Sequence, residues 1–174
     1  MKLNNTSIRI AVKMFIVDYE LALSIYGPIE YWDVSNVTNM NHLFSIMNEK
    51  TNEFEPNEFN CDIGSWNVVN VTDMSYMFSC APEFNQDISR WDVGNVINMS
   101  CMFSHTPNFN QDISRWDVGN VINMFTMFSC SKFNQDISRW DVGNVIDMSH
   151  MFSYSNFNQD ISRWDVGNVI NMKN

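Results

Sequence analysis

Two cysteines and a histidine lie at the same distance after three different tryptophans, and these residue types can bind a metal ion. Cys80, His105 and Cys130 each follow a tryptophan by fourteen residues. If those tryptophans mark successive turns of a repeat, the three side chains lie about 5 Å apart, close enough to share a zinc ion. However, the same position holds Tyr154 and Ile46 in other copies, and no fourth ligand accompanies it. The spacing therefore indicates a variable surface position, and we expect no metal there.

Carboxylates also recur, in two series that resemble acid–base pairs. One series includes Asp87 and the other includes Asp92, and both continue at regular intervals later in the chain. Carboxylates stacked about 4.8 Å apart repel each other, so we expect a neighbouring arginine column to compensate them in an exposed Arg–Asp network. Calcium binding by the Asp columns is the alternative. Because an active site needs one asymmetric constellation, we expect no catalytic residue, no cofactor and no enzyme.

All six tryptophans share one sequence context, which reveals the repeat that must position these side chains. Each begins the motif Trp-Asp/Asn-Val-x-Asn-Val-x-Asn/Asp-Met, a fixed-period signal of a repeat fold. The tryptophans are Trp32, Trp66, Trp91, Trp116, Trp140 and Trp164, at spacings of 34, 25, 25, 24 and 24. The first spacing contains a charged insertion around residues 48–58, which we expect to loop out. An enzymatic pocket outside the repeat columns would lie near this insertion.

The period of 24–25 residues predicts an α/β repeat, a right-handed leucine-rich-repeat-like solenoid. The motif Ile-x-x-Trp-x-Val predicts one short parallel strand per turn, centred on Arg-Trp-Asp, with Trp and Val inward. Val96, Met99, Met102 and Phe103 share a helical face and predict a short helical or 3-10 arm. We expect the indoles to form one buried spine. We also expect Asn95 and its copies to hydrogen-bond backbone groups at a corner.

The first 28 residues differ from the rest and predict a capping helix over the first turn. Residues 8–26 contain no Gly or Pro, Asn5 or Thr6 can cap the helix, and Gly27 followed by Pro28 ends it. A membrane-surface helix is disfavoured because its basic residues are offset by acidic ones. Residues 29–174 form the predicted repeat solenoid, with turns starting near each Trp and a partial last turn at Trp164. No cap is evident there, so we expect an open edge.

Composition excludes several classes of function. The formal net charge is −10, which argues against a nucleic-acid surface. No apolar run reaches the ~20 residues of a membrane-spanning helix, and no secretory signal is evident. Four cysteines are too few for a disulfide framework, so we expect free thiols in a reducing, intracellular compartment.

The repeat resembles the BspA-type leucine-rich-repeat surface proteins, a lipoprotein-type repeat domain of unknown function. The resemblance rests on Trp-Asp-Val-Ser-Asn-Val-Thr-Asn-Met at residues 32–40 and on Met-Phe-x(5)-Phe-Asn-Gln-Asp-Ile-Ser-Arg-Trp at residues 102–116. It implies a non-enzymatic binding or adhesion module. Bacterial members are typically secreted or lipid-anchored surface proteins. The segment ending in Tyr-Gly-Pro-Ile at residues 26–29 resembles the leader of copies in large DNA viruses and protists. We therefore expect an intracellular location, which is the host cytoplasm if the protein is viral.

We therefore expect a scaffold that binds a protein partner through the exposed sheet face or through the variable edge loops before the second Phe of each turn. Drift without function is the alternative explanation of the loop variation. The candidate partner-binding residues are Arg90, Asp92, Arg115, Asp117, Arg139, Asp141, Arg163, Asp165, His105, Lys132 and Tyr154. The alternative function is an assembly role, in which the C-terminal edge stacks end-to-end on another copy.

Overall fold

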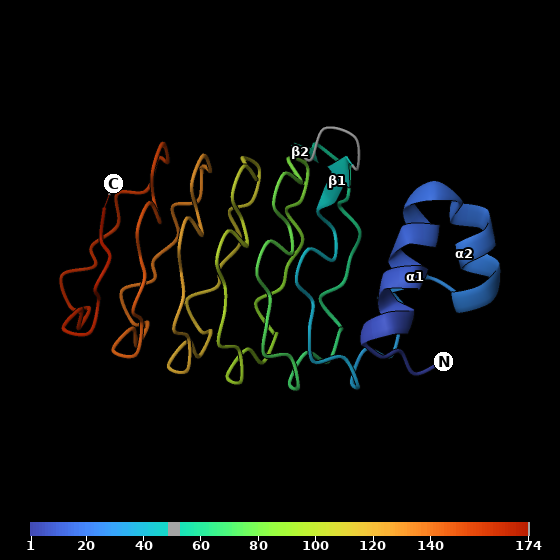
Figure 1. Cartoon of the computed structure of the whole chain (residues 1–174), viewed down its shortest axis with the longest axis horizontal. Helices are drawn as coiled ribbons and strands as arrows, with labels where there is room; N and C mark the ends of the chain where they lie inside the picture. Colours follow the sequence, from blue (N-terminus) through green and yellow to red (C-terminus); the bar gives the residue numbers. More distant parts are fainter. Residues whose placement is uncertain (49–52, 174) are drawn as a thin grey trace.

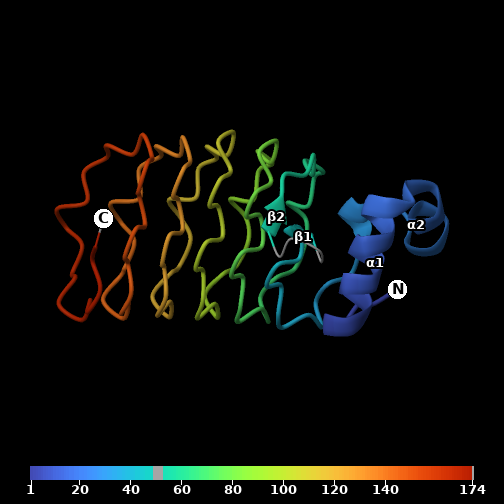
Figure 2. The ribbon, with the colours of Figure 1, turned by 45° about the horizontal axis from the view of Figure 1, so that its top comes forward.

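The computed structural model describes residues 1–48 and 53–173 of the chain. Helices α1 (Asn5–Val17) and α2 (Tyr19–Tyr26) come first, followed by the 3-10 helix η1 (Ile29–Tyr31). Strands β1 (Ile46–Asn48) and β2 (Glu53–Glu55) form an antiparallel hairpin. The two α-helices lie at one end of the molecule, and the chain then runs as a row of turns to the other end (Figures 1 and 2).

The single N-terminal helix that we predicted is two helices, because Asp18 interrupts it. The Asp18 N–H still bonds to Met14 O, but its side chain accepts from the Leu21 N–H at 3.1 Å and starts α2. This local bond competes with continuation of the helix. The N-cap of α1 is Asn4, which precedes both predicted positions, Asn5 and Thr6, and α2 ends at Gly27 with φ 73°.

α1 packs on the first repeat through its buried residues Ile8, Ala11 and Val12. Asn5 Oδ1 accepts from the backbone N–H groups of Thr38 and Asn39, at 2.8 and 3.1 Å. The helix therefore supplies polar as well as apolar contacts to this end of the repeats.

The division of the chain at residue 28 stays a prediction. None of the helices in the described residues is long and apolar enough to cross a membrane.

The predicted α/β leucine-rich-repeat-like solenoid is wrong. Within described residues 32–173 there is no helix, and apart from the β1–β2 hairpin there are only isolated bridges, such as Asn98↔Asn123. The segment expected to be a strand forms turns: the Trp116 N–H bonds to Ile113 O at 3.1 Å, and the Val121 N–H bonds to Val118 O at 2.9 Å.

The expected helical arm is also a series of turns. Thr126 and Cys130 have φ values of 57° and 54°, and the same two positions have positive φ in other copies. Right-handed helix requires negative φ, so these residues prevent the arm from winding into a helix.

The two sides of each turn are joined to the next turn by different bonds. Along the arm, every second backbone N–H bonds to the following copy; Met124 to Asp147 O and Phe128 to Met151 O are both 2.9 Å. On the tryptophan side, side chains make the connection. The Trp116 indole N–H donates to Ile88 O of the preceding copy at 3.2 Å. The backbone on this side therefore needs no strand pairing.

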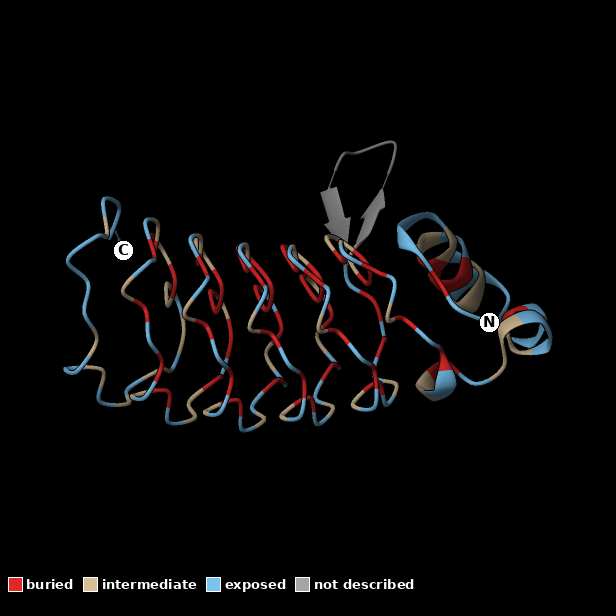
Figure 3. Ribbon diagram, turned by 90° about the horizontal axis from the view of Figure 1, so that it is seen from below, coloured by how far each residue is buried: buried red, intermediate tan, exposed pale blue. Residues whose placement is uncertain are grey.

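The indoles form one column through the core, as we predicted. Five of them are at most 5% exposed, and Trp164 in the last copy is half-buried. Stacked pairs have ring centroids 6.3–6.5 Å apart, for example Trp91 and Trp116 at 6.5 Å. Buried residues recur at matching positions in successive turns, whereas the last turn is largely exposed (Figure 3).

Candidate functional site

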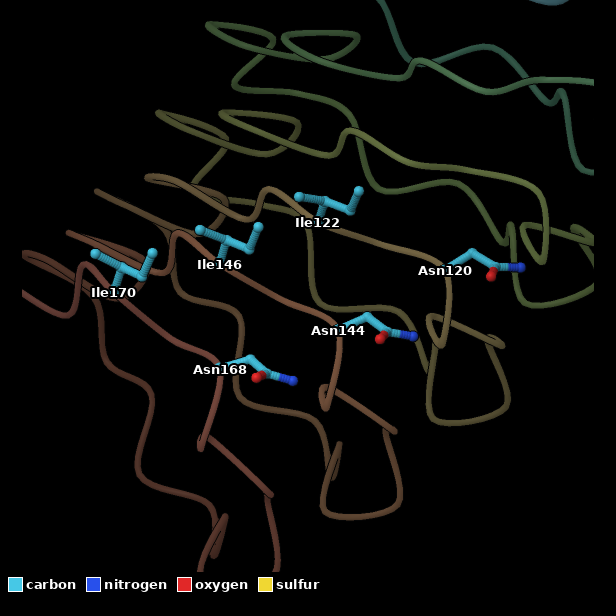
Figure 4. Close-up of a pocket in the computed structure, with 6 residues that line it drawn as sticks. All are labelled: Asn120, Ile122, Asn144, Ile146, Asn168 and Ile170. Carbon is cyan, nitrogen blue, oxygen red and sulfur yellow. The ribbon is translucent and has the colours of Figure 1, made fainter.

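Two parallel rows of side chains lie along one long side of the repeats, and we call them the Asn–Ile face. One row is Asn70, Asn95, Asn120, Asn144 and Asn168, and the other is Thr72, Ile97, Ile122, Ile146 and Ile170. Two shallow, connected hollows follow these rows; the one at the C-terminal end measures about 520 Å³. Figure 4 shows that the asparagines of three copies project in one direction, with the isoleucines in a parallel row beside them.

Local alternation along the chain produces this face. Asn120 and Ile122 are exposed, whereas Val121 between them is fully buried. The Asn120 amide nitrogen donates to Gly94 O at 2.7 Å, and the Ile122 N–H donates to Ile97 O at 2.9 Å. The same two bonds recur in neighbouring copies, so each row is fixed by the preceding turn. The predicted structural role of the Asn column is confirmed.

The Asn–Ile face has no charged side chain, on a strongly acidic protein, and one of its two rows is almost entirely apolar. Ile97, Ile122 and Ile146 are 46%, 42% and 41% exposed, and Ile170 is 79% exposed. Single exposed isoleucines are ordinary, but four in consecutive turns make a contiguous strip, which is typical of an interaction site. Each amide nitrogen donates one of its two hydrogens to a backbone carbonyl, and the asparagine side-chain oxygen can accept a hydrogen bond from a ligand.

The Asn–Ile face was not predicted from the sequence, because the isoleucines fall at the start of the segment expected to be a helical arm. The signal that could have found them is the alternation Asn-Val-Ile-Asn, in which inward valine is flanked by outward residues. A period of two indicates extended backbone with one solvated side. The failed helix prediction therefore concealed a row of exposed isoleucines along the repeats.

The predicted Arg and Asp residues lie elsewhere on the turns, and all of them are exposed. Asp92 Oδ1 accepts from the Gly94 N–H at 3.2 Å, and Asp117, Asp141 and Asp165 make the equivalent bond. In residues 1–48 and 53–173, no Arg–Asp ion pair joins the two columns, so the predicted network is wrong there. The carboxylates are held by local backbone bonds instead. Their role in partner binding stays a prediction.

The Asp87 series is also bonded within its own turn. Hydrogen bonds from the Ser89 hydroxyl and N–H lower the pKa of Asp87 below its usual value, and the charge of Arg90 adds a smaller effect. Asp112 has the same arrangement with Ser114 and Arg115. Depressed carboxyl pKa values of this kind do not suit a general acid at neutral pH.

The predicted edge residues line a second surface, which we call the variable edge. Its positions are Cys80, His105, Cys130 and Tyr154, all with φ between 54° and 58°. A hollow beside them is lined by Cys80, His105, Cys130 and three prolines, and Tyr154 is 92% exposed. Lys132, also exposed, lies two residues beyond Cys130. The structure thus brings His105 together with Cys80 and Cys130.

No group of three or more His, Cys, Asp or Glu residues suited to a metal ion is found among the described residues. Burial raises the pKa of Cys80 and of the buried Cys101, so neither is an activated thiolate. The hypothetical pocket at the insertion, residues 48–58, falls partly outside the described residues, which exclude 49–52.

Comparison with known proteins identifies one family. The model described as "Mycoplasma protein of unknown function, DUF285" matches residues 4–105, 46–155 and 129–174. This family is related to the BspA-like repeats, so the predicted resemblance is confirmed at that level. No curated protein and no solved structure gives a significant match.

Proposed function

We propose that this chain, which belongs to the family described as Mycoplasma protein of unknown function, DUF285, is a non-enzymatic scaffold that binds a protein partner through the Asn–Ile face. The observation that carries the proposal is the strip of four exposed isoleucines in consecutive turns. An adhesive role like that of BspA-type leucine-rich-repeat surface proteins is one specific form of this function.

The energetics of the face favour binding. Burying the exposed part of one isoleucine contributes about 1–2 kcal/mol at ~25 cal/mol per Å². Because hydrogen bonds to the preceding turn already hold Asn120, Ile122 and their copies, little further ordering is required on association. The matching partner surface is an apolar ridge that carries hydrogen-bond donors for the asparagine oxygens. Its charge does not need to be positive, because the face itself is uncharged.

Crosslinking at defined positions tests the choice of face. A photoreactive amino acid is placed at Ile122 or Ile146, and in matched controls at Arg115, Arg139 or Tyr154. We expect the isoleucine positions to crosslink a discrete protein in cells of the native source, and the doubly substituted Ile122→Asp, Ile146→Asp protein to compete poorly for it. Crosslinks confined to the arginine positions or to Tyr154 would move the binding surface to the sites predicted from sequence.

End-to-end assembly is a second candidate function, favoured by the exposed apolar surface of the last described turn. A hollow of about 410 Å³ opens there against Phe152, Trp164 and Met172, and Met172 is 58% exposed. Sedimentation over a range of concentrations tests this function. A strict monomer at the highest concentration would end it, whereas self-association that Met172→Asp abolishes would support it.

A further inference from the structure

A separate hollow of about 310 Å³ lies between α1 and the first repeat. Its apolar wall includes the buried residues Val12 and Leu43, and Ile16 lines it while remaining 43% exposed. One water molecule, which has one non-hydrogen atom, occupies ~30 Å³ in the liquid. By that measure the hollow has room for about ten non-hydrogen atoms. This volume suits a small molecule with an apolar body.

Two cations of α1 line the same hollow. Arg9 and Lys13 are four residues apart and therefore share a face of the helix. The Arg9 guanidinium is fixed by neutral acceptors, Asn41 O and Asn39 Oδ1, both at 2.8 Å. Within the described part of the chain, neither cation forms an ion pair. On a protein with a net charge of −10, this is a local positive region.

The first repeat adds a hydroxyl that has no partner. Ser45 is one of the residues that line the hollow, and its Oγ is a buried atom that makes no hydrogen bond. The equivalent Ser104 Oγ lies 3.0 Å from His105 Nδ1, and Ser129 Oγ donates to Cys130 Sγ. In the first repeat the following residue is Ile46, which has no polar side-chain atom. A buried donor of this kind is costly unless a further group accepts from it.

We infer that this hollow binds a carboxylate that carries a short aliphatic chain. Lys13 and the unused N–H groups of Arg9 attract the carboxylate, and Ser45 Oγ donates to one of its oxygens. Val12, Ile16 and Leu43 cover the aliphatic chain. The other titratable groups facing the hollow are His42, which lines it, and Asp73, which acts electrostatically on His42 from the next repeat. The site is distinct from the Asn–Ile face and does not depend on the proposed protein partner.

The octanoate anion, which has about ten non-hydrogen atoms and is supplied as the sodium salt, is a suitable probe of the full chain. Methyl NMR spectra are recorded during titration, with octan-1-ol and acetate as controls for the charge and for the chain. We expect octanoate to shift the methyl signals of Val12, Ile16 and Leu43 while the Ile122 signal stays in place. Octan-1-ol or acetate binding as tightly as octanoate, or shifts centred on Ile122, would overturn the inference.

The variant Lys13→Met tests the charge without touching the bonds of Arg9. It is expected to weaken octanoate binding about two- to fivefold, in keeping with one partly exposed ion pair, and to leave octan-1-ol unaffected. Ser45→Ala is expected to weaken octanoate binding as well. The matched control Lys132→Met, on the variable edge, should leave the affinity unchanged. An unchanged octanoate affinity in either Lys13→Met or Ser45→Ala would refute the assignment.

Discussion

Trp116 illustrates what the tryptophan contributes to the stability of a turn. Trp116 is 3% exposed, stacks on Trp91, and donates its indole N–H to Ile88 O of the preceding copy at 3.2 Å. It therefore combines apolar burial with one of the bonds that join two copies. Its inward position could be predicted from sequence because tryptophan recurs in every copy within the same apolar spacing, Ile-x-x-Trp-x-Val.

Trp116→Ala is expected to lower the free energy of unfolding by about 3–5 kcal/mol, because it leaves a cavity and an unpaired Ile88 carbonyl. Trp116→Phe keeps a ring in the column and is expected to cost less. Urea denaturation of the three proteins measures both effects. An alanine variant as stable as the parent would contradict the buried position of the indole.

Aspartates make the stability of the turns depend on pH. The pKa of Asp112 is lowered by hydrogen bonds from the Ser114 hydroxyl and N–H. Because the folded-state pKa lies below the unfolded value of 3.8, the stabilisation is present above 3.8 and is lost as pH falls through the folded-state pKa. Asp87 behaves in the same way with Ser89.

We therefore expect the urea midpoint to fall when the pH is lowered from 5 to about 2.5. The double variant Asp87→Asn, Asp112→Asn retains the acceptor oxygens but cannot titrate, so its midpoint should fall less. Equal acid sensitivity of the parent and the variant would show that these two carboxylates do not contribute.

At the scale of elements, α1 takes the place of a preceding turn. In later copies the N–H groups of Ile122 and Asn123 both donate to Ile97 O, at 2.9 and 3.4 Å. The first copy has no such carbonyl before it, and Asn5 Oδ1 accepts from Thr38 and Asn39 in its stead. From the sequence Asn5 is expected to be a helix cap, because a contact across 33 residues leaves no local pattern.

Asn5→Ala is expected to destabilise the protein by about 0.5–1.5 kcal/mol, since it removes the acceptor of two backbone N–H groups. Asn156→Ala is the matched control, because the Asn156 side chain is exposed and makes no such bond. Thermal unfolding compares the two variants. A loss of equal size in both variants, or no loss in Asn5→Ala, would contradict the role of Asn5 as the acceptor of these two N–H groups.

The prediction of strands and helical arms failed for a physical reason. Left-handed backbone is usually signalled by glycine, but here Thr126, Cys130 and Tyr154 adopt it, at φ values of 54–57°. These residues give no local sign of the conformation, and hydrogen bonds to the next copy hold Thr126 and Cys130 in it. A period-two pattern also cannot predict the hydrogen bonds from indole N–H groups to backbone carbonyls, which join the turns where strand pairing was expected.

At the scale of the whole molecule, each copy contacts mainly its neighbours, and two kinds of bond run along the row. Backbone N–H groups join the arms, while indole and amide groups join the opposite side. The two sides together hold the isoleucines in register across four turns. The rows of the Asn–Ile face therefore follow from the repeat itself, whereas the variable edge differs from copy to copy.

Hydrogen exchange measured by NMR tests this division of bonding most directly. We expect slow exchange at the backbone N–H groups of Met124, Thr126 and Phe128 and at the indole N–H of Trp116. The backbone N–H groups of Asp117 and Val118 make no hydrogen bond in the structure and should exchange rapidly. Strong protection at Asp117 and Val118 with rapid exchange of the Trp116 indole would instead indicate strand pairing on the tryptophan side, and would contradict the account.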